Sequence, residues 1–458
     1  MSPMSHSHQT LYLAPIVHAP TRAHLEIHAA LICIRSGRVA WVERLPSLSH
    51  QAADTAAARR GTDLDNLVVV DEGFLCPGMV DTHTHAPQYP NNGLGHSLQL
   101  LEWLDALTFP LERKFSDDDY ARQVYGEVVW RTLAAGTTTA CYYSTLHVPA
   151  SLTLAEVALE AGQRALVGRC SMDRNSPPDY VEESCVASMT STHEFLDAFP
   201  HFFANTPSIL SNGSAYANQP LVRPILTPRF ALSCSPPLLS ALGNLAKEND
   251  LPIQTHISEN HAEIEAVCKA FPDLPSYAGV YDHFGLLTPR TILAHGVHLT
   301  PDEVSLIAER GAGVSHCPTS NVNLNSGTAR VLGLLDAGVR VGLGSDCSGG
   351  PATGVLAAIR SADAMSRILA FEGLTARGLS IAELWFLATR GGADIAGVDA
   401  GSFEPGREFD ALWIRPRSPG FWGGGDTRAL FEKWLFAGDD RDIGAVWVRG
   451  RCVSGSPP

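Results

Sequence analysis

No stretch of about 18 consecutive apolar residues occurs in the sequence, so we expect no transmembrane helix and no membrane partner. The N-terminus lacks a basic segment followed by an apolar core, which argues against a signal peptide. No two of the ten cysteines form a C-x-x-C pair, and this scatter predicts buried thiols in a reducing cytoplasm. Basic residues number 33 against 48 acidic ones, and the formal net charge of -15 argues against a nucleic-acid partner.

The sequence does contain enough apolar material for a large core, since 45% of its 458 residues are hydrophobic. This length fits one large barrel domain with an accessory domain, or two or three smaller domains. From residue 74 onward, apolar runs alternate with helical patterns. The alternation is typical of an α/β fold of the (β/α)8 barrel type, with strands expected at 74–80, 137–143, 164–172, 222–230, 251–256, 291–295, 313–317 and 339–346. Helices are expected between them, among others at 261–270 and 301–310.

Both flanks of this region contain short β-type runs, at 11–17, 25–34, 39–42, 411–414 and 443–448. We expect the two flanks to pair into one small domain, a β-sandwich outside the barrel. The small domain then consists of residues 1–73 and 401–458, and the barrel of residues 74–400. Residues 203–220 are rich in Asn, Ser, Pro and Ala, which predicts a surface insertion.

Histidines stand at the expected ends of several strands, where the active sites of barrels lie. His83 and His85 are two positions apart, so both imidazoles point to the same side of a strand. His256, His295 and Asp346 come at or just past the ends of three later strands. One such histidine alone is more often a hydrogen-bonded core residue, but the convergence of all five side chains on one rim favours a metal site.

Three imidazoles from His83, His85 and His256, together with the carboxylate of Asp346, form the ligand pattern of a catalytic zinc site with an open position for water. The sequence does not distinguish zinc from iron. It favours one metal ion over two, because Arg229 stands at the end of the fourth strand, where barrel enzymes with two metals usually have a bridging lysine.

Glu259 lies three positions after His256, close enough to the expected metal site to exchange protons with a bound water. Its alternative role is that of a helix N-terminal Glu, which the helix dipole favours. Asp346 can hold the water by a hydrogen bond as well as contact the metal. His295 is placed to polarise the group under attack.

Several stretches carry a family resemblance. The metal-ligand set resembles the amidohydrolase superfamily, and further blocks are similar to its guanine deaminase family. These blocks are residues 77–89, 101–104 (LEWL), 108–110 (TFP), 136–142, 227–230 (TPRF), 255–260 (THISEN), 316–318 and 342–346. The HxH and the final Asp are shared throughout the superfamily, whereas the LEWL, TFP, TPRF and HISEN blocks together are specific. The resemblance extends from about residue 67 to 452.

The resemblance implies hydrolysis of guanine to xanthine and ammonia, with one zinc ion per chain and water as co-substrate. It assigns zinc to His83, His85, His256 and Asp346. The purine is assigned to Gln88, Arg229 and Phe230, with contacts from His256 and His295; Glu259 matches the proton shuttle, and His295 the histidine beside the leaving amine. It also implies a cytoplasmic homodimer.

Other readings compete with this one. A related enzyme of the superfamily would act on another purine, a pterin or a triazine. A non-catalytic barrel scaffold would lack a metal ligand or Glu259, and neither is missing. The alternatives for the pocket residues are ordinary: Phe230 as a core residue and Arg229 as part of a surface ion pair. As residues at a strand end, both are expected to line the pocket.

Overall fold

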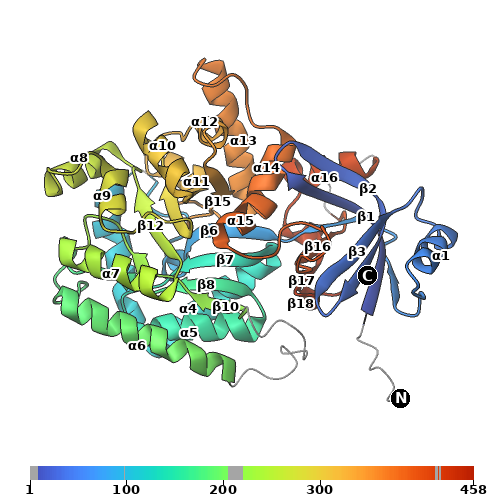
Figure 1. Ribbon diagram of the computed structural model, residues 1–458, viewed down its shortest axis with the longest axis horizontal. Helices are drawn as coiled ribbons and strands as arrows, with labels where there is room; N and C mark the ends of the chain where they lie inside the picture. The colour runs from blue at the N-terminus through green and yellow to red at the C-terminus, as the bar shows by residue number, and fades with distance from the viewer. Residues whose placement is uncertain (1–8, 97, 205–219, 418–420, 422–423) are drawn as a thin grey trace.

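The computed structural model describes residues 9–96, 98–204, 220–417, 421 and 424–458. Nearly all of the insertion expected at 203–220 lies outside the described residues. A sheet built from both flanks of the chain stands at one end of the molecule, and a larger body of parallel strands and helices forms the other (Figure 1). Among the described helices, none combines the length and apolar character needed to cross a bilayer.

The flanking sheet contains eight strands, in the order β18-β17-β16-β5-β1-β2-β3 with β4 paired to β1. Its N-terminal strands and its C-terminal strands meet at β5 and β16, which are antiparallel. The strands are β1 (Gln9–Thr21), β2 (His24–Arg35), β3 (Arg38–Arg44), β4 (Leu67–Val69), β5 (Phe74–Pro77), β16 (Ala411–Ile414), β17 (Ile443–Val448) and β18 (Arg451–Gly455). The expected pairing of the two flanks is therefore present in one connected sheet.

The first barrel strand was expected at 74–80, and here the structure differs. The run divides at Gly78: β5 joins the flanking sheet, and β6 (Met79–His85) begins the parallel strands. A Cβ atom at residue 78 would lie 2.2 Å from the side chain of Thr138, so only glycine fits at this crossing point. His83 and His85 consequently lie within β6 and not beyond its end.

The parallel strands form three sheets, with the orders β10-β8-β7-β6, β11-β9 and β12-β13-β14-β15. After β6 these are β7 (Thr137–Tyr143), β8 (Arg164–Gly168), β9 (Cys170–Ser171), β10 (Val222–Pro224), β11 (Thr227–Pro228), β12 (Ile253–Ile257), β13 (Thr291–His295), β14 (Gly313–His316) and β15 (Arg340–Leu343). The runs at 164–172 and 222–230 are each split in two. At the second split the chain changes its bonding partner: the backbone N–H of Ile225 bonds to the carbonyl oxygen of Val167, and that of Leu226 to the carbonyl oxygen of Pro252.

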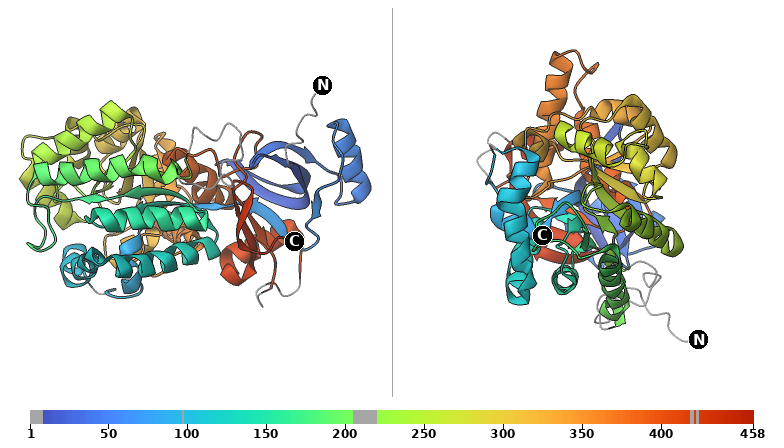
Figure 2. Two further views of the ribbon diagram at one scale, coloured as in Figure 1. Left: turned by 90° about the horizontal axis from the view of Figure 1, so that it is seen from below. Right: turned by 90° about the vertical axis from the view of Figure 1, so that its left-hand side faces the viewer.

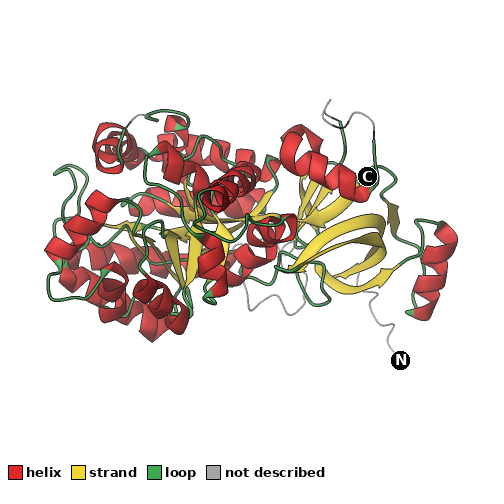
Figure 3. Cartoon of the chain, turned by 90° about the horizontal axis from the view of Figure 1, so that it is seen from above, coloured by secondary structure: helices red, strands yellow, loops and turns green. Residues whose placement is uncertain are grey.

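Helices cover the parallel strands on the outside (Figures 2 and 3). Two of them have the predicted bounds: α8 (His261–Ala270) and α10 (Pro301–Arg310), each opened by a capping box. The other α-helices are α1 (His50–Arg59), α2 (Leu100–Trp103), α3 (Phe109–Glu112), α4 (Asp118–Ala134), α5 (Val148–Ala161), α6 (Cys185–Ala204), α7 (Pro236–Asn249), α9 (Tyr277–His283), α11 (Pro318–Asn323), α12 (Val331–Asp336), α13 (Val355–Phe371), α14 (Ile381–Phe386), α15 (Gly392–Ala396) and α16 (Thr427–Ala437). A short π-helix (Leu104–Thr108) links α2 to α3.

Buried charges join the parallel strands to the flanking sheet. Arg164 of β8 donates hydrogen bonds of 3.2 and 3.0 Å to Asp410, just before β16, and also pairs with Glu408. Arg449, between β17 and β18, donates to the same Glu408 at 2.9 Å. The side-chain partners of Arg164 among the described residues, Asp410 and Glu408, are carboxylates, so its charge is compensated within the protein. The sheet is therefore attached firmly to the body that carries the polar cluster described next.

Candidate metal centre and adjoining pocket

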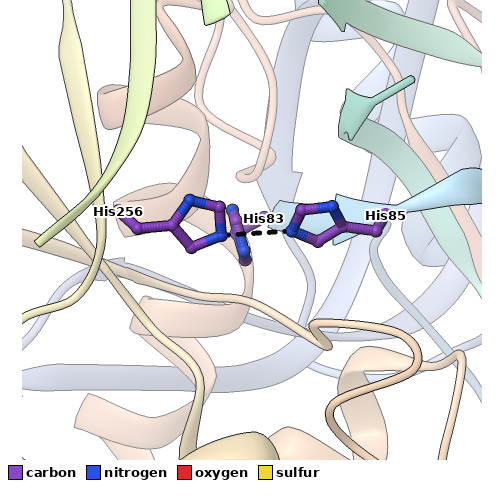
Figure 4. A group of neighbouring side chains, drawn as sticks. All are labelled: His83, His85 and His256. Atoms are coloured by element: carbon purple, nitrogen blue, oxygen red, sulfur yellow. Dashed lines mark hydrogen bonds between the residues drawn. The ribbon is translucent and has the colours of Figure 1, made fainter. Parts of the chain in front are cut away.

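Three imidazoles converge at the carboxyl ends of the parallel strands. His83 and His85 extend from the same face of β6, as their spacing predicts, and His256 comes from β12. Figure 4 shows the three rings directed toward one another. Asp346 follows β15 by three residues and completes the group. The side chains of His83, His85 and Asp346 are at least nine-tenths buried.

The distances within this group fit a single small ion. His85 Nε2 and His256 Nε2 lie 3.2 Å apart, and His83 Nε2 lies 3.2 Å from Asp346 Oδ1. Asp346 Oδ1 is also 3.7 Å from His85 Nε2. Zinc–nitrogen bonds of about 2.0–2.1 Å in tetrahedral geometry place ligand atoms about 3.3–3.4 Å apart. His83 Nε2 forms no hydrogen bond of ordinary geometry among the described residues, although Asp346 Oδ1 lies 3.2 Å away, as expected for two atoms that bind the same ion.

The protonation of these groups suits metal binding. Burial lowers the pKa of all three histidines, most strongly for His85 and His256, so the imidazoles are neutral. Burial alone would raise the pKa of Asp346, but the surrounding histidines hold it well below its usual value. His256 Nδ1 donates to the carbonyl oxygen of Arg229 at 2.6 Å, which leaves the lone pair on Nε2.

A second carboxylate holds the end of β15 against β6. Asp81 is fully buried and accepts hydrogen bonds from the backbone N–H of Ser345 at 3.0 Å and from its hydroxyl at 2.5 Å. The adjacent N–H of Asp346 donates to the carbonyl oxygen of His83 at 3.0 Å. Burial raises the pKa of Asp81 to about 7. These contacts fix the distance between Asp346 and the histidines of β6.

Glu259 and His295 form a pair beside the metal group. His295 Nε2 lies 3.4 Å from Glu259 Oε2 and 3.8 Å from Asp346 Oδ2, and its Nδ1 is 2.8 Å from the side-chain oxygen of Asn321. Ser326 donates to the other oxygen of Glu259 at 3.2 Å. Burial raises the pKa of Glu259 to about 7. Burial alone would lower the pKa of His295, but the carboxylates of Glu259 and Asp346 raise it above its usual value.

The alternative role for Glu259, that of a helix N-terminal carboxylate, is performed by another residue. Asn260 is the N-cap of α8, and Glu263 supplies the reciprocal bond of its capping box. Glu263 also accepts the backbone N–H of Glu259 at 2.9 Å. Glu259 itself lies outside the helix, and its side chain borders a cavity.

That cavity lies next to the metal group. It is lined by His85, Gln88, Leu100, Trp103, Leu104, Arg229, Phe230, His256, Glu259, Glu263, His295, Leu324 and Asp346. The structure thus brings every candidate site residue to one place, with His83 just behind the cavity wall. Arg229 is only 2% exposed, so it is not part of a surface ion pair. Phe230 is buried but presents its side chain to the cavity.

The sequence reasoning missed Glu112, which lies directly behind the pocket. It is fully buried at the end of α3 and pairs with Arg229 through two hydrogen bonds, of 2.6 and 3.0 Å. Gln88 donates to it at 3.0 Å and Tyr180 at 2.8 Å. The signal in the sequence was weak, because Glu112 precedes Arg113 and resembles part of an exposed charged run. Its position two residues after the TFP block was the available clue.

The lysines between the ligand histidines do not line the cavity beside the metal group. Lys114 and Lys247 are both exposed, the second on the surface of α7.

Another group with metal-ligating atoms, His83, His295 and Cys317, shares the first histidine. Burial raises the pKa of the Cys317 thiol well above its usual value, which disfavours the thiolate needed for coordination.

Comparisons with known proteins identify the family of this chain. Residues 74–453 match the amidohydrolase family. The chain is 43% identical to a probable guanine deaminase of Schizosaccharomyces pombe, over 97% of this chain and 83% of that protein. It is 43% identical to a guanine deaminase of Homo sapiens, over 83% of both chains. A guanine deaminase of C. acetobutylicum, solved with guanine in its active site, superposes with a TM-score of 0.87 at 32% identity, covering 98% of this chain and 100% of that one. This chain therefore belongs to the amidohydrolase family.

Proposed function

We propose that this chain hydrolyses guanine to xanthine and ammonia with the help of one zinc ion. Relatives with at least 43% identity over most of the chain bear the name guanine deaminase, and a similar solved structure holds guanine. The observation that carries the proposal is one cavity that joins the three-histidine and aspartate group to Gln88, Arg229 and Phe230.

His83, His85, His256 and Asp346 would hold the zinc ion. When bound, zinc lowers the pKa of a coordinated water from about 16 to about 7 and so supplies a nucleophile at neutral pH. The remaining groups on this rim then have separate tasks in binding and proton transfer. The position of each side chain in the cavity indicates which task it has.

Glu259 is the proton carrier of the proposed reaction. Its carboxylate accepts a proton from the attacking water and passes it to a purine ring nitrogen, since the carbon under attack lies between two such nitrogens. A group that both takes and gives protons near neutral pH needs a pKa near 7, and burial gives Glu259 about this value. His295, 3.4 Å from Glu259, would stand beside the departing amine.

Arg229, Gln88 and Phe230 would recognise the purine. A guanidinium donates to the ring carbonyl of guanine, a side-chain amide both donates and accepts along an edge, and a phenyl ring packs against the flat face. Adenine has an amine where guanine has the carbonyl, so Arg229 would meet a donor. A buried polar group left unpaired costs about 1–3 kcal/mol, which favours guanine.

We further infer that the parallel strands close into a (β/α)8 barrel. Asp346 N–H bonds to His83 O across β15 and β6, and Gln254 N–H bonds to Leu226 O at 2.9 Å between β11 and β12. These contacts join the separate sheets edge to edge. On this proposal the barrel begins at Met79, and the flanks form the accessory β domain.

Release of ammonia from guanine, adenine, cytosine, a pterin and a triazine tests the proposed function. We expect release from guanine at a kcat/KM at least about 10²-fold above every other compound. Faster release from a pterin or a triazine would support the alternative enzymes of the same superfamily. No release from any compound by zinc-loaded protein would support the non-catalytic scaffold.

A further inference from the structure

Glu112 forms hydrogen bonds to two polar residues of the pocket, Gln88 and Arg229, that lie outside its own short helix. Its Oε1 accepts from Gln88 Nε2 and Arg229 Nη2, both at 3.0 Å. Its Oε2 accepts from Arg229 Nη1 at 2.6 Å and from the Tyr180 hydroxyl at 2.8 Å. Four donors thus saturate one fully buried carboxylate, which lies behind the cavity and does not line it.

These bonds determine how the two polar side chains of the pocket are presented. The guanidinium of Arg229 is held at both terminal nitrogens and lies 5.1 Å from the ring centroid of Phe109, so it cannot rotate freely. Gln88 donates to Glu112 at one end and accepts from the backbone N–H of Ser348 at 3.3 Å at the other. Because a carboxylate only accepts, the amide nitrogen of Gln88 must face Glu112.

Glu112 also cancels the charge of Arg229. Among the described residues, the titratable side chains that interact electrostatically with Glu112, besides Arg229, are Tyr180, Tyr125, Cys170 and His147. Burial raises the pKa values of the two tyrosines and the cysteine and lowers that of His147, so these four groups are uncharged near neutral pH. The purine edge of the pocket therefore presents aligned hydrogen-bond donors without a net positive charge.

Substrate and product differ in charge, and the affinity of the purine edge of the pocket depends on that charge. Guanine is uncharged near neutral pH. Xanthine carries a second ring carbonyl in place of the amine, which makes its ring N–H more acidic, and it loses a proton to solvent in mildly alkaline buffer. An unpaired guanidinium would attract that anion and retain the product.

We propose that Glu112 is a positioning and specificity-determining residue that makes the pocket bind uncharged purines and release anionic ones. It acts through Arg229 and Gln88 and does not itself contact the ligand. The inference rests on the proposed deamination of guanine and adds to it a discrimination between substrate and product.

The test compares two inhibitors in mildly alkaline buffer, where xanthine is mostly an anion and hypoxanthine is mostly neutral. In Glu112→Gln the shape is kept and the charge removed, so Arg229 carries an uncompensated charge. We expect the ratio of the xanthine Ki to the hypoxanthine Ki to fall about tenfold or more relative to wild type, while the KM for guanine rises. Equal changes in both Ki values, or no change, would overturn the proposal, because a merely structural role acts on both ligands alike.

Two further variants complete the test. Tyr180→Phe removes one hydrogen bond to the same carboxylate but leaves its charge, so the Ki ratio should stay within about twofold of wild type. Glu112→Gln combined with Arg229→Gln replaces the buried ion pair by two amides, which is tolerated better than removal of one partner. If the single variant does not fold, this double variant decides: a Ki ratio within about twofold of wild type would support the proposal, because neither partner then carries a charge, and a ratio that falls about tenfold or more would overturn it. If wild-type protein releases no ammonia from guanine, the proposed function fails, and equilibrium binding of the two purines still tests Glu112.

Discussion

Replacement of Glu259 by Gln separates proton transfer from metal binding and from folding. The side chain keeps its size and its hydrogen bond from Ser326, which lies 3.2 Å from Oε1. It lies outside the group of His83, His85, His256 and Asp346, so we expect zinc to be retained. An amide cannot accept the proton of the attacking water, and general acid–base groups contribute about 10²–10⁴-fold to turnover.

We therefore expect the kcat for guanine to fall by at least about 10²-fold, or about 2.7 kcal/mol in activation free energy. A group that serves two proton transfers in one turnover can lose more. Because burial raises the pKa of Glu259, its charge is unfavourable in the folded protein, and the melting temperature of the variant should not fall. Glu303→Gln is the matched control: this buried Glu caps α10 away from the cavity, so the variant should lose thermal stability and keep its turnover.

The assays are ammonia release, zinc content by elemental analysis and thermal unfolding, all on the same preparations. Near-normal kcat in Glu259→Gln with zinc retained would refute the reasoning, because another residue would then move the protons. Loss of zinc from this variant would refute the assignment of the four ligands.

Three further predictions follow from the same geometry. Elemental analysis of purified protein should find about one zinc per chain, and two tightly bound ions would contradict the single-metal site formed by three histidines and Asp346. Arg229→Met should reduce kcat/KM for guanine by about 10–150-fold, the cost of a charge-assisted hydrogen bond, with zinc content unchanged; unaltered kinetics would remove Arg229 from the pocket. The kcat/KM for adenine and for cytosine, measured by absorbance, should be at least about 10²-fold below that for guanine. If adenine were turned over as fast as guanine, Arg229 would be excluded as the determinant of specificity.

Much of the fold and of the candidate site could be predicted because their signals are local. The bounds of α8 and α10 were predicted without error, since Asn260 with Glu263 and Thr300 with Glu303 form capping boxes visible in the sequence. The spacing of His83 and His85 alone places both on one face of β6. Parallel strands then bring their carboxyl ends together whatever their order in the sheet.

The rest depends on contacts between distant residues. The division of residues 74–80 between β5 and β6 is set by Gly78 against Thr138, and one continuous apolar run gives no sign of it. Burial of the Glu112 carboxylate depends on distant partners, above all on Arg229, 117 positions later, which neutralises its charge. Beside Arg113 and Lys114, its local pattern predicts exposure instead.

The same contrast separates two kinds of residue in this pocket. The side chains proposed to contact zinc or purine come from strand ends or from the few residues that follow them, and they were predicted from the sequence. Those that hold them come from segments between strands: Glu112 from α3 behind Arg229, Asn321 from α11 beside His295, and Ser326 beside Glu259. The hydrogen bonds of these three residues go to Arg229, His295 and Glu259, and not to the four proposed metal ligands. Changes in substrate preference that leave the metal site intact should therefore arise at such supporting positions, where a side chain alters the charge or orientation of its partner and not the chemistry at the metal.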